Sequence, residues 1–306
     1  MNYGIPYKGS KSKIANKILN ALPSGDVFVD LFAGGCAITH AAILSGKYNK
    51  FIVNDIQGMF PKYFHDLITG RAPKERRVIS KEQFDKYKHI DPYVSICWSF
   101  GNNCKDYLWG ENIYKQKILA CKIIMAETQY ERRIFYRKFI QSLESLESLE
   151  SLESLESLER LERLERLERL ERLESLESLE RLERLERLER LERLERLERF
   201  KNIKISSLSY DKVDIPDDSV IYCDPPYINT NKYNDGGFDH DRFYDWLRNI
   251  GRVVYVSEYT MPSDFIPILS ISKNCNYSAS LNAKKTVENL YVHESHIESI
   301  KKNTLF

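Results

Sequence analysis

The chain contains 306 residues, of which 42% are hydrophobic, so it is long enough to bury one or two cores, and its formal net charge is +1. It has no stretch near the roughly 18 to 20 apolar residues of a membrane span and no apolar secretory segment at its start, so no membrane association is expected. The six cysteines lack CxxC or CxxH spacing, which argues against a zinc site or a disulfide framework and favours a metal-free protein of a reducing compartment.

The first 60 residues alternate between helix and strand patterns. Apolar residues at helical spacing predict a helix over Lys13–Leu22, and a β-rich apolar run predicts a strand over Val27–Phe32 that ends in glycines. Ala37–Leu44 is predicted to form a helix and Phe51–Val53 a second strand. Strand, glycine turn, helix and strand make a βαβ unit of a parallel sheet.

Residues 61–141 lack this alternation and are predicted to form an inserted, mainly helical region. Tyr93–Gly110 is rich in aromatic and amide side chains, and Ile113–Ile140 has the pattern of one long helix with many Lys and Arg residues. Aromatic and basic side chains in one segment are typical of nucleic-acid recognition. A helical core with a solvated basic face explains the same pattern, and both interpretations stay open.

Residues 142–198 are nineteen consecutive Ser-Leu-Glu or Arg-Leu-Glu triplets. A period of three drifts around a helix of 3.6 residues per turn, so the leucines of this long low-complexity repeat form no steady seam. Glu followed by Arg four residues later predicts helix in the Arg blocks, whereas fraying is expected in the Ser blocks 142–159 and 175–180. The repeat is either a surface expansion without chemistry or a site for a protein partner.

The repeat hides the charge of the remaining chain. It holds 19 Glu and 11 Arg, and without it 35 basic residues stand against 26 acidic ones, a net charge of +9. A basic protein suits a polyanionic partner such as nucleic acid.

Strand patterns resume after the repeat, at 220–223, 252–257 and 290–293. The sequence therefore predicts an α/β protein with a Rossmann-like parallel sheet. The domain that holds the sheet would comprise residues 1–60 and 201–306, interrupted by the helical region 61–141 and by the repeat of residues 142–199.

A glycine turn follows the first predicted strand, in the sequence Val29-Asp30-Leu31-Phe32-Ala33-Gly34-Gly35. Glycines at that position let a ligand approach the backbone, and the helix that follows offers free amide donors. The turn lacks the spacing of a dinucleotide or P-loop motif. Asp55 follows the second strand, where a carboxylate can accept both hydroxyls of a ribose. The two features together indicate a cofactor that contains adenosine.

Asp224-Pro225-Pro226-Tyr227 follows an apolar strand. The prolines remove two amide donors and hold the backbone extended. What remains is a set of carbonyl acceptors between a carboxylate and an aromatic ring. Such a pocket suits an amino group on a planar ring. Cys223, just before it, is interpreted as a buried strand residue and not as a nucleophile.

These motifs resemble the Dam-like, class D12 adenine-specific DNA methyltransferases. The resemblance rests on the tetrapeptide at 224–227, on the glycine turn and on the N-terminal Pro6-Tyr7-Lys8-Gly9-Ser10-Lys11, which occur in the family's order. It covers about residues 3–60 and 203–293. Where the family often carries an acidic residue and an aromatic one before the catalytic strand, this chain has Ser209-Tyr210 followed by Asp211, and the triplet repeat is foreign to the family pattern.

The resemblance implies a role for each matching residue. Tyr7 and Lys11 would meet the methionine part of S-adenosylmethionine, and Asp55 its ribose. The remaining cofactor contacts would come from Asp30, Phe32, Ala33, Gly34 and Gly35 in the turn and from a Phe-x-His element, Phe238 and His240. Asp224, Pro225, Pro226 and Tyr227 would be the catalytic residues.

The implied reaction is methylation of the 6-amino group of an adenine that is flipped out of double-stranded DNA, without a metal, in the cytoplasm of a bacterial or phage-infected cell. A methyltransferase acting on RNA or on a protein amide is an alternative. A catalytically inactive DNA-binding or scaffolding protein is another, although the intact tetrapeptide argues against it.

Overall fold

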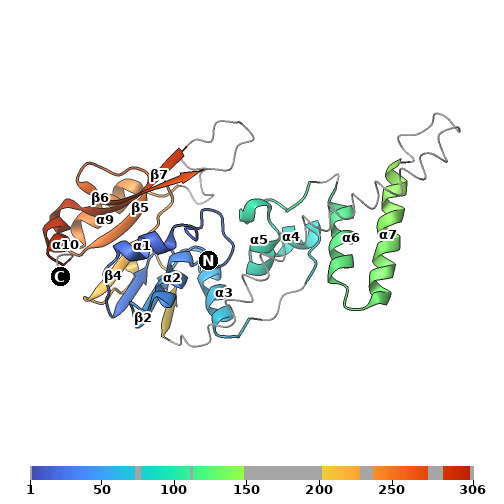
Figure 1. Ribbon diagram of the computed structural model, residues 1–306, viewed down its shortest axis with the longest axis horizontal. Coiled ribbons are helices and arrows are strands. Elements are labelled where there is room, and N and C mark those ends of the chain that lie inside the picture. Colours follow the sequence, from blue (N-terminus) through green and yellow to red (C-terminus); the bar gives the residue numbers. More distant parts are fainter. Residues whose placement is uncertain are drawn as a thin grey trace. The chain divides into compact units, whose positions relative to one another are not determined.

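The computed structural model describes six stretches of the chain: residues 2–72, 77–110, 113–147, 202–227, 237–274 and 285–303. The chain divides into two compact units. The first unit comprises Met1–Ile5, Gly9–Ala72 and Leu194–Phe306, and the second comprises Pro6–Lys8 and Pro73–Arg193. Each unit is described by itself below (Figure 1).

The first unit contains a seven-stranded sheet with the strand order β3-β2-β1-β4-β5-β7-β6. Its strands are β1 (Val27–Asp30), β2 (Lys50–Asn54), β3 (Ile203–Ser206), β4 (Ser219–Cys223), β5 (Val254–Glu258), β6 (Phe265–Asn274) and β7 (Lys285–His293). β3, β2, β1, β4 and β5 run parallel to one another, and β7 is antiparallel to both of its neighbours. This arrangement of strands fits a methyltransferase fold and confirms the predicted α/β class.

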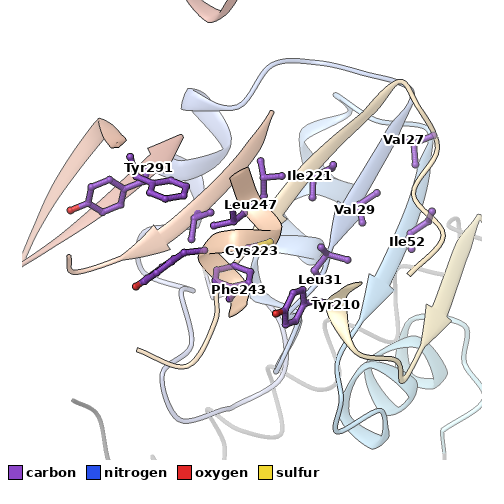
Figure 2. Close-up of a cluster of buried hydrophobic side chains, with 14 residues drawn as sticks. Val27, Val29, Leu31, Ile52, Tyr210, Ile221, Cys223, Phe243, Leu247 and Tyr291 are labelled. Carbon is purple, nitrogen blue, oxygen red and sulfur yellow. The ribbon is translucent and has the colours of Figure 1, made fainter. Parts of the chain in front are cut away.

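Side chains alternate across β1 and so reach both faces of the sheet. Val27, Val29 and Leu31 belong to a buried cluster with Phe243 and Leu247 of helix α9 (His240–Asn249), as Figure 2 shows. Asp30, between Val29 and Leu31, meets helix α2 (Ala37–Ser45) on the other face, and the four residues of β1 are all buried. Among the described residues of this unit, the other α-helices are α1 (Ala15–Ala21), α3 (Met59–Ile68) and α10 (Ile297–Asn303).

In the second unit, every long element that the structure describes is an α-helix. These helices are α4 (Lys81–Tyr87), α5 (Pro92–Cys97), α6 (Tyr114–Met125) and α7 (Gln129–Glu147), with a short 3-10 turn at Phe100–Asn102. This unit begins at Pro73, so α3, which the predicted insertion from residue 61 would include, packs in the first unit instead.

The prediction of one helix over Ile113–Ile140 was wrong, because the chain turns between α6 and α7. Thr128 and Glu131 form a capping box: the Glu131 amide donates to the Thr128 hydroxyl at 3.2 Å, and the Thr128 amide donates to the Glu131 carboxylate at 3.3 Å. A capping box starts a new helix because it satisfies the free amides of the first turn. α6 and α7 lie side by side and share a core of Ala120, Ile123 and Phe139 (Figure 1).

Helix α7 continues through the first two Ser-Leu-Glu triplets, up to Glu147. The expected fraying is therefore wrong for residues 142–147. Extension from an established helix avoids the cost of nucleation, and Leu and Glu are good helix formers. The rest of the repeat, with its predicted Arg-block helices, lies outside the described residues. In the described parts of the chain, no helix is long and apolar enough to cross a membrane.

Candidate active site

The order of the strands locates the candidate site. β1 lies between β2 and β4, and the chain builds the sheet outward in opposite directions from β1 and β4. In open α/β sheets, ligands bind beyond the carboxyl ends of the strands at such a switch point. Asp30 ends β1 and pairs in register with Tyr222 of β4, so Asp224 follows only two residues after that pair. The glycine turn and the tetrapeptide therefore leave the same edge of the sheet from neighbouring strands.

The backbone after β1 is tightly turned. Gly34 has a φ of 46° and Cys36 a φ of 56°, both in the left-handed region, and α2 begins at the next residue. The N-terminal segment packs against this turn: the Ile5 amide donates to the Gly35 carbonyl at 2.8 Å, and a Cβ on Gly4 would lie 2.2 Å from that oxygen. Gly4 is therefore required for the close approach, which fixes the turn from outside. A half-buried glycine such as Gly34 at a helix start lets a ligand approach the backbone closely, which suits an adenosine-containing cofactor.

Asp30 supplies a buried carboxylate to this turn. It is 1% exposed, and one of its oxygens accepts a hydrogen bond from the Thr39 hydroxyl at 2.6 Å. Its other oxygen has no hydrogen-bond partner among the described residues. Burial, and then the charges of Asp224 and Asp55, raise the pKa of Asp30 to about 7. An acceptor of this kind fits a cationic ligand group.

Asp55 follows β2, and its side chain stabilises the glycine turn after β1. One carboxylate oxygen accepts from the Gly34 amide at 2.8 Å, and the other accepts from the Gln57 amide at 2.8 Å. Burial raises the pKa of Asp55, while these two hydrogen bonds lower it, and the net direction is upward. Carboxylate oxygens can accept further hydrogen bonds, so the arrangement is compatible with the predicted ribose contact.

Aromatic rings form a wall next to the glycine turn. The ring centroids of Phe32 and Tyr210 are 5.6 Å apart, those of Phe32 and Phe238 are 5.6 Å apart, and those of Tyr210 and Phe238 are 5.9 Å apart. The carboxylate of Asp211 pairs with Arg242 at 2.6 Å. At the position where the chain departs from the family's pattern, Tyr210 thus joins the wall, while Asp211 is held in an ion pair.

The tetrapeptide contributes a carboxylate and a ring. The Asp224 side chain is 18% exposed, and its Oδ1 lies 2.7 Å from the Lys11 ammonium. The Lys11 nitrogen also lies 4.5 Å from the centroid of the Tyr227 ring, and the centroids of the Tyr227 and Tyr259 rings are 4.6 Å apart. The His240 imidazole lies within hydrogen-bond distance of the Pro226 carbonyl oxygen, at 2.8 Å, and so holds the loop after β4.

Glu288 on β7 completes the cluster, and sequence reasoning missed it. It is 2% exposed and lies 3.7 Å from the Lys11 ammonium. Burial lowers the pKa of Lys11, but the negative charges of Asp224 and Glu288 outweigh burial, so the pKa is raised and Lys11 is protonated. Glu288 precedes the strand predicted at 290–293, and no local signal in the sequence marks it as a buried charge.

The predicted site residues therefore fall into two groups. Asp30, the glycine turn, Asp55, the aromatic wall, Lys11 and the tetrapeptide all lie in the first unit. Tyr7 belongs to the second unit, within Pro6–Lys8, where the Lys8 amide donates to the Asn102 carbonyl at 3.3 Å. Among the described residues, no group of three His, Cys, Asp or Glu side chains could hold a metal ion.

The sheet and its switch-point cluster define an α/β protein of the methyltransferase class. The family model of the D12 class N6 adenine-specific DNA methyltransferases matches residues 7–88, which include Lys11, the glycine turn and Asp55 but not the tetrapeptide. This match confirms the resemblance over those residues and supports a DNA adenine methyltransferase activity. No curated protein matches the chain.

Proposed function

We propose that the chain transfers the methyl group of S-adenosylmethionine to the 6-amino group of an adenine that is flipped out of double-stranded DNA. The observation that carries this proposal is the pair of strand ends at the switch point. The glycine turn after β1 offers a cofactor site, and the tetrapeptide after β4 offers an amino-group acceptor directly beside it.

The cofactor half of the site is formed by residues around the glycine turn. S-adenosylmethionine, when bound, supplies a methyl group on a positively charged sulfur. Asp30 has a free acceptor oxygen for the ammonium of its methionine part, and Asp55 lies where the ribose hydroxyls are expected. The rings of Phe32, Tyr210 and Phe238 offer apolar surface to the adenine ring. The contact of Tyr7 with the methionine part stays a prediction.

The target half of the site acts on the amino group. An adenine inside a duplex is out of reach, so it must leave the stack. Tyr227 stacks on the flipped base, and the Asp224 carboxylate and the Pro225 carbonyl accept its two amino hydrogens. These hydrogen bonds would orient the nitrogen lone pair toward the methyl group of the bound cofactor, in a near-attack pose. The nitrogen gains the methyl group and loses one proton, which Asp224 is positioned to accept.

The second unit supplies the proposed DNA-recognition surface. Helix α7 exposes Arg133 and Arg137, one turn apart, and Tyr130, which is 74% exposed, on one helical face. No ion pair involving either arginine occurs among the described residues. Arginines without an acidic partner suit phosphates, and exposed aromatic rings suit bases.

The test is transfer of radiolabelled methyl groups from S-adenosylmethionine to duplex DNA, single-stranded RNA and protein. Wild type is expected to label duplex DNA. The Asp224→Ala variant should lose at least about 100-fold in rate, because it removes a hydrogen-bond acceptor that acts on the reacting group. Glu258→Gln, which removes another buried acid on the adjacent strand, is the control for folding. Labelling of RNA or protein but not of DNA by the wild type would contradict the proposal.

A further inference from the structure

Lys11 occupies the position that the proposed mechanism gives to the target base. Its ammonium is 2.7 Å from Asp224 Oδ1 and 4.5 Å from the centroid of the Tyr227 ring. The carboxylate is the proposed acceptor of the amino group, and the ring is the proposed stacking face. Because the base and the ammonium cannot hold this position together, Lys11 must withdraw from Asp224 when adenine enters.

A withdrawing ammonium needs another anion. The Lys11 side chain is 7% exposed, and an unpaired charge in such surroundings is costly. The charged groups that act on Lys11 are Asp224, Glu288 and the ionisable phenol of Tyr259. Of these, Glu288 is the second carboxylate, 3.7 Å from the ammonium and itself 2% exposed. A small rotation of the lysine side chain reaches it.

We infer that Glu288 is a positioning residue that receives the Lys11 ammonium when the target amino group replaces it on Asp224. The inference rests on the proposed function, in which Asp224 binds that amino group. Entry of the base then exchanges one buried ion pair for another. The ammonium stays near the site, and the Asp224 oxygen that it held becomes available to the incoming amino group.

Glu288 also has contacts that suit this role. It lies beside the hydroxyl of Tyr227, and after burial and Asp224 its charge is a further cause of the raised pKa of that phenol. Glu288 is thus close to both groups that must rearrange when the base arrives. Its strand, β7, is anchored between β5 and β6, so the carboxylate has a rigid support.

The first test is the single-turnover rate of methyl transfer to duplex DNA by Glu288→Gln, which keeps the size of the side chain and removes its charge. The rate is expected to fall at least about 10-fold, because the Lys11 ammonium then has no second anion. The affinity for S-adenosylmethionine should change less than about 2-fold, since no cofactor contact is lost. Glu288→Asp, which keeps the charge, should recover part of the rate. A wild-type rate in Glu288→Gln would overturn the inference.

The second test needs no activity. Thermal unfolding of the ligand-free protein is measured for Glu288→Gln in the wild-type and in the Lys11→Met backgrounds. Glu288→Gln should lower Tm when Lys11 is present. It should raise Tm in Lys11→Met, where Glu288 and Asp224 are left as neighbouring carboxylates without their cation. Equal effects in the two backgrounds would show that the two side chains are not coupled and would overturn the inference.

Glu258→Gln is the matched control for this cycle. Glu258 is also 2% exposed and lies on β5, the strand next to β7, but it is not among the groups that act on Lys11. Its effect on Tm should be the same in both backgrounds. If wild type transfers no methyl group to DNA, the proposed function fails, whereas the thermal cycle still decides whether Lys11 and Glu288 are paired.

Discussion

The fold raises the pKa of Asp30 far enough to make the stability of the protein depend on pH. Asp30 is buried at the end of β1, and burial together with Asp224 and Asp55 raises its pKa to about 7. An acid with a raised pKa keeps its proton in the folded state at pH values where the unfolded chain has lost it. Its contribution to stability is therefore complete below the ordinary pKa of an aspartate and falls as the pH rises toward about 7.

The fall in stability with rising pH gives a prediction for the Asp30→Asn variant, whose side chain cannot ionise. The Tm of the variant minus the Tm of the wild type should be more positive at about pH 8.5 than at about pH 5.5, because only the wild type then buries a charge. Thermal unfolding at a series of pH values measures it. Asp218→Asn, at an exposed carboxyl, is the control, and its difference should stay level. A pH-independent difference for Asp30→Asn would mean that Asp30 is not buried as described.

At the residue scale, the sequence identified the groups that stand at strand ends. Asp55 and Asp224 were predicted from their positions after strands, and Asp30 from the family resemblance; parallel strands bring their carboxyl ends to one edge. Glu288 was not predicted. Its partner Lys11 is far away in the chain, and only the antiparallel packing of β7 brings the two together. A pairing that depends on strand order leaves no local mark in the sequence.

At the element scale, the break between α6 and α7 depends on one capping box. Thr128→Ala removes the hydroxyl that accepts from the Glu131 amide, and it should destabilise the start of α7 by about 1 kcal/mol. Hydrogen exchange of the amides in the first turn of α7 measures the loss directly. Glu127→Ala, at the preceding exposed position, is the matched control. Unchanged protection in Thr128→Ala would contradict the capping role.

The basic face of α7 carries a separate prediction. Arg133→Ala together with Arg137→Ala should weaken binding to duplexes of every sequence and lower the slope of log K against log salt by up to about 1.8, since each phosphate contact contributes about 0.9. Fluorescence anisotropy at several salt concentrations tests this. Lys17→Ala on an exposed position of α1 should leave the slope unchanged. A wild-type slope in the double variant would exclude this face from DNA contact.

The helix over Ile113–Ile140 shows why element boundaries were less predictable than element types. The apolar and basic pattern runs on across the turn, and it masked the sequence Thr128-Gln129-Tyr130-Glu131, which is itself a capping signal. β3 and β6 were not predicted either. Both are edge strands: β3 has only four residues, and Pro267 interrupts the apolar run of β6, which argues against a strand.

At the scale of the whole molecule, the sequence predicted the α/β class from the βαβ pattern of residues 27–53 and from the strand at 220–223. The strand order required the structure, because the parallel neighbours β1 and β4 are separated in the sequence by the entire helical region and the repeat. The charge of +9 outside the repeat and the family match to residues 7–88 both favour DNA as the substrate. The charge is a property of the whole chain outside the repeat, whereas the match covers residues 7–88, and the two observations agree.

The central claim concerns one atom, the 6-amino nitrogen of adenine. Duplex DNA methylated by the purified chain can be digested to nucleosides and analysed by mass spectrometry. The account predicts N6-methyladenine in DNA treated with wild type and none above background with Asp224→Ala. Methyl groups on cytosine, or the same yield of N6-methyladenine from Asp224→Ala as from wild type, would contradict it.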